Sequence, residues 1–173
     1  AEHDSARILG ERIAALTHGH PDGYRAAGAF SALISYLIDG TALLDAATTV
    51  RDETAKLPWG TETAAKLSNA IDLAEKDIPD ADAVPQLGTG KTAERALAVG
   101  LFCVLRYEDN FSEAVRAAAN HGGDSSVTAS VAGQIAGACI GREAIPAELT
   151  EKLELSAMIN DYGMQIGSLR GCL

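Results

Sequence analysis

Apolar side chains recur along nearly the whole chain at intervals of three and four residues, which is the spacing of one helical face. The pattern is typical of amphipathic helices in segments 8–16, 23–38, 41–50, 61–74, 93–107, 113–120, 125–140 and 147–169. No segment alternates apolar and polar residues between hairpin turns, as a strand of a half-buried sheet would. The sequence therefore predicts an all-α fold, built as a compact multi-helix bundle.

Polar residues and glycines indicate where several of these helices begin and end. Asp22, Thr92 and Ser112 precede apolar runs, and their side-chain oxygens can cap a helix N-terminus. Gly141 follows the apolar run 125–140 and is a natural C-terminal stop. We expect Pro146 to start one last helix that continues to Leu169.

Segment 76–91 is the only long stretch that we expect to be irregular. It carries two prolines and two glycines within sixteen positions, counted from Lys76 to Lys91. A loop of this length inside a compact domain is usually functional or disordered. Segment 76–91 is therefore a candidate binding loop.

Length and charge exclude several classes of function. A chain of 173 residues, 47% of them apolar, is long enough for one domain with a real core, and we expect a single domain over residues 1–173. The formal net charge of −10 argues against nucleic-acid and anionic-membrane partners. No apolar run reaches the roughly 20 residues that span a bilayer. Three cysteines without regular spacing favour a reducing compartment, so we expect a cytoplasmic protein.

The segment Leu87–Thr92, "LGTGKT", has the appearance of a phosphate-binding P-loop. That motif requires a glycine five residues before Gly90, and Pro85 occupies the position. It also requires a buried strand upstream, which the preceding residues do not predict. We exclude a P-loop, although glycines at a helix start can still present free N–H groups to a phosphate.

The turn 17–22, "THGHPD", places His18, His20 and Asp22 close together in sequence. A zinc site would need a further ligand at about 2.0–2.3 Å. A turn whose polar groups cap two helices is the favoured interpretation. Cys103 lies in the apolar run "LFCVL" and is better explained as a small buried side chain than as a nucleophile.

Asp124 stands between Gly122-Gly123 and the helix predicted over 125–140. An aspartate in this position commonly caps the helix. A divalent cation is the alternative, because carboxylate and hydroxyl oxygens are its preferred ligands. Asp124, Ser125, Ser126 and Thr128 could offer such oxygens from one turn, but only Asp124 is charged. Residue types alone leave both interpretations open.

Three segments together resemble the ADP-ribosylglycohydrolase family. Segment 16–40 resembles its Thr-His-x-His-Pro-x-Gly helix entry. Segment 87–141 is similar to its Gly-x-Gly loop, the following helix and the metal-binding turn, in order and spacing. Segment 145–159 resembles the closing helix. The resemblance implies an all-α fold and hydrolysis of ADP-ribose from modified side chains, with ADP-ribose or an ADP-ribosylated protein as the partner.

The resemblance also implies a site. In the family, two Mg²⁺ or Mn²⁺ ions hold the ribose hydroxyls and an attacking water. Asp124 matches the first aspartate of the family's Gly-Gly-Asp-x-Asp-[Ser/Thr] turn. Ser126 stands at the second aspartate, and Val127 stands at the hydroxyl ligand. The metal-ligand positions are therefore Asp124 and Ser126, whereas valine cannot coordinate a metal.

Four further residues match positions near the family's substrate. His18 matches a histidine beside the bound ADP-ribose, and Gly123 belongs to the metal-binding turn. Gly88 and Gly90 match the loop that approaches the nucleotide, with Lys91 in place of the usual aromatic residue. We assign substrate binding to these four positions, and no residue is assigned a catalytic role.

Nothing in the chain matches the family's early Gly-Asp-x-x-Gly and Thr-Asp-Asp-Thr segments. We therefore expect the C-terminal portion of the fold, without its N-terminal helices. Metal binding is therefore expected to be weak or absent. Without those helices this chain should expose apolar surface, which either a homodimer or a missing N-terminal half would cover. Two functions stay open, a metal-dependent hydrolase and a non-catalytic module that binds ADP-ribose or a protein.

Overall fold

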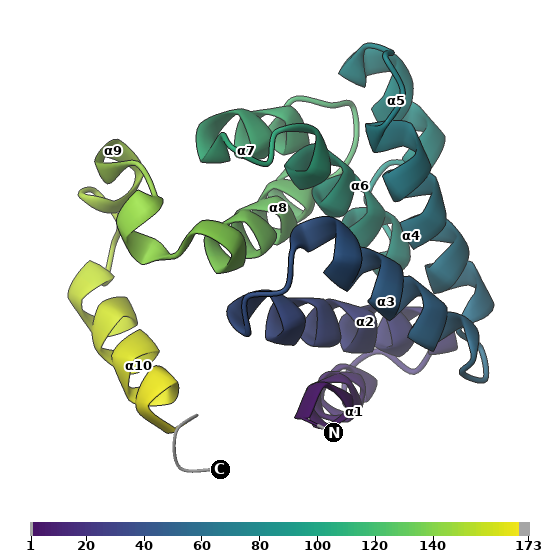
Figure 1. The fold of residues 1–173 in the computed structure, drawn as a ribbon, viewed down its shortest axis with the longest axis horizontal. Coiled ribbons are helices and arrows are strands. Elements are labelled where there is room, and N and C mark those ends of the chain that lie inside the picture. Colours follow the sequence, from purple (N-terminus) through teal and green to yellow (C-terminus); the bar gives the residue numbers. More distant parts are fainter. Residues whose placement is uncertain (1, 170–173) are drawn as a thin grey trace. The chain divides into compact units, whose positions relative to one another are not determined.

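The computed structural model describes residues 2–169, which are helical with no strand among them (Figure 1). This confirms the all-α prediction. The chain divides into two compact units, residues 1–140 and 141–173, of which 2–140 and 141–169 are described. The helices of the first unit are α1 (Glu2–Ala15), α2 (Pro21–Ile38), α3 (Leu43–Ala55), α4 (Thr61–Ala74), α5 (Asp80–Leu87), α6 (Ala93–Arg106), α7 (Phe111–Ala119) and α8 (Ser125–Ile140).

Helix α6 lies at the centre of the first unit. It contacts α2, α4, α7 and α8, and every residue from 96 to 104 is buried. A helix that is apolar on all sides is stable only when other helices surround it. Leu101 and Phe102 are fully buried and anchor this core. Helix α6 therefore fixes where the N-termini of its neighbours lie.

The segment expected to be irregular contains helix α5 instead. The prediction over 76–91 was wrong for residues 80–87, where Pro85 lies inside the helix. Proline removes one helical hydrogen bond and disfavours a helix interior. Burial of Ala83, Val84 and Leu87 in the core offsets that cost. The helix ends at Gly88, whose φ is +116°.

Two helix caps differ from the predicted ones. The N-cap of α2 is His20, not Asp22, and its Nδ1 accepts a hydrogen bond from the Asp22 N–H at 3.3 Å. The N-cap of α7 is Asn110, not Ser112, and its side-chain oxygen accepts from the Glu113 N–H at 3.1 Å. At each of these helix starts, both neighbouring polar residues have side chains that can accept from a backbone N–H. The sequence alone therefore did not specify which of them is the N-cap.

Helix α1 contacts α2 through a polar network. Glu11 Oε1 lies 2.9 Å from Arg7 Nη1 and 2.7 Å from Arg25 Nη1, and all three side chains are largely buried. The large apolar side chains of α1, Ile8, Leu9 and Ile13, are exposed, and so is Leu16 in the turn that follows. The expected exposure of apolar surface is confirmed here, whereas the homodimer stays a prediction.

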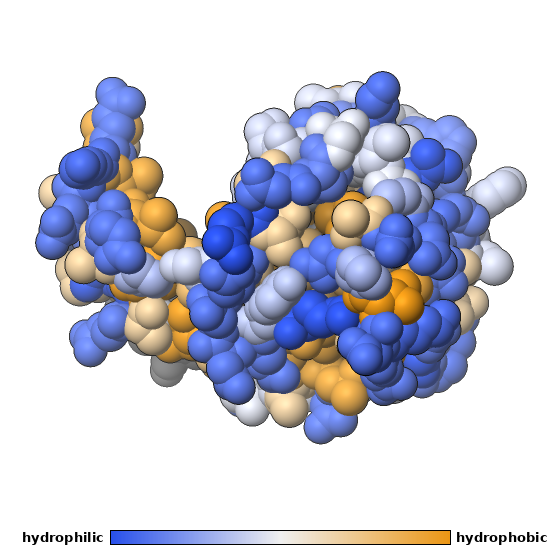
Figure 2. Space-filling view, turned by 90° about the horizontal axis from the view of Figure 1, so that it is seen from above, coloured by the Kyte–Doolittle hydropathy of each residue, from blue (hydrophilic) through white to orange (hydrophobic). Residues whose placement is uncertain are grey.

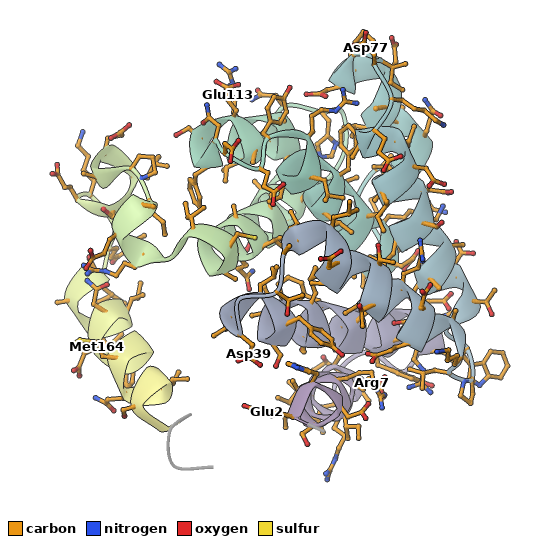
Figure 3. The ribbon with its side chains drawn as sticks, viewed as in Figure 1. Glu2, Arg7, Asp39, Asp77, Glu113 and Met164 are labelled. Atoms are coloured by element: carbon orange, nitrogen blue, oxygen red, sulfur yellow. The ribbon has the colours of Figure 1, made fainter. Side chains whose placement is uncertain are left out.

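The second unit contains a 3₁₀ turn η1 (Arg142–Ala144), α9 (Ala147–Thr150) and α10 (Ser156–Leu169). The prediction of one helix over 147–169 was wrong, because turns occupy 151–155 and Leu155 has a φ of +61°. Helical spacing of apolar residues continues across these turns, so periodicity could not reveal the break. Many of the apolar side chains in this unit are exposed, including Met158, Ile159 and Met164 (Figure 3).

The first unit has a mainly polar surface on the face seen from above. Smaller hydrophobic areas lie between the hydrophilic side chains there (Figure 2). Within residues 2–169, no helix has both the length and the apolar character needed to cross a membrane.

Candidate functional site

A cavity of about 630 Å³ lies where three segments of the first unit meet. The turn between α1 and α2 contributes His18 and His20, and the loop before α6 contributes Gly90 and Lys91. The turn before α8 contributes Asp124. Small-molecule sites typically have volumes of about 300–1,000 Å³. The structure therefore brings together His18, Gly90 and Asp124, which lie far apart in the sequence.

Three helices begin at this cavity. Asp22 in the first turn of α2, Thr92 at the N-cap of α6, and Asp124 next to the start of α8 all line it. A helix N-terminus presents unpaired N–H groups and a partial positive charge. Thr92 was predicted as a cap and stands at that position, but its hydroxyl donates to Glu94 and not to a backbone group. The start of α6 therefore keeps N–H groups for an anion, with the exposed Lys91 beside them.

Glu94 is a wall residue of this cavity that the sequence analysis missed. Its side chain is 8% exposed, and its Oε1 accepts from Thr92 Oγ1 at 2.5 Å and lies 3.8 Å from Arg95 Nε. A buried carboxylate is costly unless such partners compensate it. The helical spacing of the sequence could have identified Glu94 as a buried residue. Glu94 lies four residues before Ala98 and seven before Leu101, so it shares the buried face of the helix.

The turn before α8, residues 122–124 (the Asp124 turn), contacts residues 88–90 (the Gly-x-Gly loop) through backbone atoms. The Asp124 N–H donates to the Thr89 carbonyl oxygen at 2.7 Å. A Cβ on Gly123 would lie within 2.7 Å of the Thr89 carbonyl carbon and closer still to its oxygen. Gly90 has a φ of +72°, and a Cβ there would lie 2.6 Å from Thr128 Cγ2. Glycine is therefore required on both sides of this contact.

A buried hydrogen-bond network holds the same turn in place. Thr128 is fully buried, and its hydroxyl donates to the Ala118 carbonyl oxygen at 2.7 Å. The Gly123 N–H donates to His121 Nδ1 at 3.1 Å, and His121 Nε2 lies 2.7 Å from Thr128 Oγ1. Because Nδ1 accepts, the neutral ring carries its proton on Nε2 and donates it to Thr128. His121 was not predicted as a site residue, and Thr128, which the sequence offered as an oxygen donor for a cation, is instead buried in this network.

Of the other predicted positions, Gly88 and Ser126 do not line the cavity, whereas Val127 does. Gly88 lies next to the Arg95 side chain, where a Cβ would be 2.7 Å from its Cδ. Ser126 is exposed, and its hydroxyl donates to Asp124 Oδ1 at 3.2 Å. Val127 lines the cavity and is 42% exposed. An apolar side chain thus faces the cavity where the resemblance places a hydroxyl ligand.

The histidine turn has the geometry of a cap. His18 Nδ1 lies 2.8 Å from Thr17 Oγ1, and His20 Nδ1 is engaged by the Asp22 N–H. Within the described residues no three His, Cys, Asp or Glu side chains are placed to hold a metal ion. The capping interpretation of this turn is therefore supported by its contacts. Cys103 is fully buried, and burial raises its pKa to about 12, which suits a core side chain and not a nucleophile.

The donor set at the Asp124 turn does not fit a two-metal site. One carboxylate, Asp124, is joined by the neutral hydroxyl of Ser126, and the next position is Val127. Divalent cations need several oxygen ligands, and their affinity rises with the number of charged ones. The expectation of weak or absent metal binding stays a prediction, and it can be tested by restoring ligands.

The double substitution Ser126→Asp and Val127→Thr is expected to strengthen Mn²⁺ binding at least about tenfold, because it adds a second carboxylate and a hydroxyl. Both positions are exposed, so the fold should tolerate the change. Electron paramagnetic resonance of free Mn²⁺ measures the affinity. Adding Asp124→Asn to the double variant should abolish the gain. An unchanged affinity in the double variant would show that this turn is not a metal position.

Comparison with known families agrees with this geometry. The family model described as ADP-ribosylglycohydrolase matches residues 1–170. No curated protein and no solved structure matches the chain. The matched range covers all three segments that form the cavity, and its all-α character agrees with the observed fold. The chain belongs to the ADP-ribosylglycohydrolase family.

Proposed function

We propose that this chain binds ADP-ribose, free or attached to a protein, in the cavity between the α1–α2 turn, the Gly-x-Gly loop and the Asp124 turn. One observation carries the proposal: His18, Gly90 and Asp124, each from a segment that resembles the family's substrate site, line a single cavity. The family points to an ADP-ribosylglycohydrolase-like function at this coarser level.

The cavity offers complementary groups to the two halves of the ligand. The N–H groups at the start of α6 and the ammonium of Lys91 suit the diphosphate. The carboxylates of Asp22, Glu94 and Asp124 accept hydrogen bonds and suit ribose hydroxyls. Phosphate is expected next to Lys91, because a site among the carboxylates alone would repel it.

We further propose that these residues recognise ADP-ribose without hydrolysing its glycosidic bond. The family's chemistry uses metal ions to position the sugar and to activate water. The Asp124 turn supplies one carboxylate, and the buried Glu94 is already bonded to Thr92. The chain therefore acts as a binding module, and release of ADP-ribose requires ligands that the described residues do not provide.

Isothermal titration calorimetry tests this function. We expect saturable binding of ADP-ribose, and adenosine should bind at least about tenfold more weakly because it lacks the phosphates. Exchanging MgCl₂ for EDTA should leave the dissociation constant within about twofold, since the described residues include no three His, Cys, Asp or Glu side chains placed together to hold a metal ion. Lys91→Ala should weaken binding, whereas Lys152→Ala, an exposed lysine of the second unit, should not.

Two results would contradict the proposal. Absence of any heat with ADP-ribose would remove the recognition function. Mg²⁺-dependent release of ADP-ribose from modified arginine would show that the chain is a hydrolase and not a binding module.

A further inference from the structure

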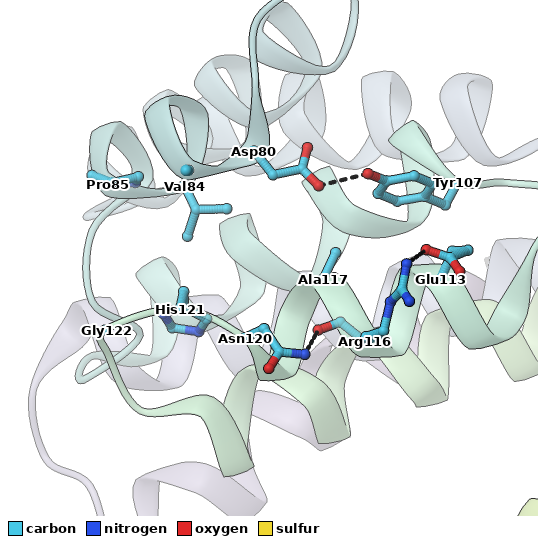
Figure 4. Close-up of a pocket in the computed structure, with 11 residues that line it drawn as sticks. Asp80, Val84, Pro85, Tyr107, Glu113, Arg116, Ala117, Asn120, His121 and Gly122 are labelled. Carbon is cyan, nitrogen blue, oxygen red and sulfur yellow. Dashed lines mark hydrogen bonds and ion pairs between the residues drawn. The ribbon is translucent and has the colours of Figure 1, made fainter.

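A second cavity, of about 570 Å³, lies between α5, the C-terminal end of α6 and α7 (Figure 4). Its residues share no member with the first cavity. Asp80 and Tyr107 face one another at one end, and His121 lies at the other (Figure 4). Val84 and Ala117 provide apolar surface between them. The family resemblance assigned no role to this part of the molecule.

Asp80 and Tyr107 form the most defined polar pair in this cavity. The Tyr107 hydroxyl donates to Asp80 Oδ2 at 2.6 Å. That hydrogen bond, together with burial, raises the pKa of Tyr107. The phenol therefore keeps its proton at neutral pH, and its oxygen lone pair still accepts. Asp80 keeps its second oxygen, Oδ1, as a further acceptor.

The remaining charges leave the cavity negative. Glu113 is paired with Arg116, whose guanidinium is already engaged by that ion pair. The Asn120 amide N–H donates to the Arg116 carbonyl oxygen, which leaves the Asn120 side-chain oxygen as an acceptor. Asp80 has no cationic partner of its own in the lining. With Glu113 and Arg116 paired, the carboxylate of Asp80 is the remaining formal charge among the lining residues, so an anionic ligand such as phosphate is disfavoured.

We propose that this second cavity binds a guanidinium or primary ammonium group carried on a short apolar stem. The cation lies against Asp80 Oδ1 and the Tyr107 hydroxyl oxygen, and the stem packs on Val84 and Ala117. A guanidinium supplies five N–H donors and an ammonium three, enough to bond to both of these oxygens. The same chemistry is found in a free small amine and in an arginine side chain of a polypeptide. This site is independent of the ADP-ribose proposal.

Titration with agmatine, a free guanidinium amine, tests the site by calorimetry and by NMR of the ¹⁵N-labelled chain. We expect saturable binding with shifts at the amides of His121 and Gly122, which line the cavity. Asp80→Asn should raise the dissociation constant at least about tenfold, because it removes the charge that faces the cation. Asp45→Asn removes the same charge from an exposed position in α3. This control should leave the dissociation constant for agmatine within about twofold.

A second variant covers the case in which Asp80→Asn unfolds the start of α5. Glu113→Gln lies on α7 and should weaken agmatine binding while circular dichroism shows an unchanged helix content. A parallel titration with acetyl-arginine-amide identifies the source: tighter binding than agmatine indicates a polypeptide arginine, and weaker binding indicates a free amine. Non-saturable shifts, or equal weakening in Asp45→Asn and Asp80→Asn, would show non-specific attraction to an acidic chain and overturn the site.

Discussion

Replacing Gly123 with alanine is expected to lower the free energy of unfolding by about 2–3 kcal/mol and to abolish ADP-ribose binding. The added Cβ would overlap the Thr89 carbonyl group, which is backbone and cannot rotate away. The Asp124 N–H would then lose its bond to the Thr89 oxygen. The turn and the Gly-x-Gly loop would separate, and both walls of the first cavity would move.

Thermal unfolding followed by circular dichroism measures this effect. For a chain of this length, a loss of that size corresponds to a fall in Tm of about 5–10 °C. Gly122→Ala is the matched control, because a Cβ on Gly122 meets no atom within 4 Å. The Gly122→Ala substitution should therefore change the Tm only slightly. Equal shifts in the two variants would mean that chain flexibility, and not the Thr89 contact, sets the cost.

Replacing Thr128 with valine is expected to destabilise the chain by about 2–4 kcal/mol, although the two side chains have nearly the same shape. The hydroxyl is fully buried and bonds both to the Ala118 oxygen and to His121 Nε2. Valine would leave the Ala118 oxygen buried without a partner and would remove the hydrogen bond of the half-buried His121 Nε2–H. Urea unfolding gives the free-energy difference.

Thr63 provides the matched control for this substitution. It is also fully buried, but its hydroxyl has no hydrogen-bond partner. Thr63→Val should therefore be neutral or stabilising, since it removes a buried hydroxyl that makes no bond. If Thr63→Val cost as much as Thr128→Val, the network around His121 would contribute nothing to the turn.

The helices were predictable because burial on one face leaves a periodic trace in the sequence. Helix α5 escaped detection because Pro85 carries the local signal of a loop, while the stabilising contacts of Val84 and Leu87 come from other helices. The break before α10 was hidden for the opposite reason. Apolar spacing continues through Leu153 and Leu155, although the backbone there turns.

The sequence identified several residues of the first cavity, but not the contacts that bring them together. The resemblance named His18, Gly90 and Asp124, and these three line one cavity. Glu94 was missed because a glutamate in a first helical turn is ordinary, and only its burial makes it notable. His121 was missed because its contacts join a turn to a helix seven residues later, a relation that spacing alone does not specify.

The residues that hold the Asp124 turn in place are not the ones that would bind a metal. Gly123, Thr128 and His121 make the contacts that hold the turn. Positions 126 and 127 are exposed, and the Ser126 hydroxyl makes one hydrogen bond, to Asp124. Mutations at the two exposed positions therefore cost little stability. Two surface substitutions therefore change the oxygen ligands that this turn offers without touching the contacts that hold the turn in place.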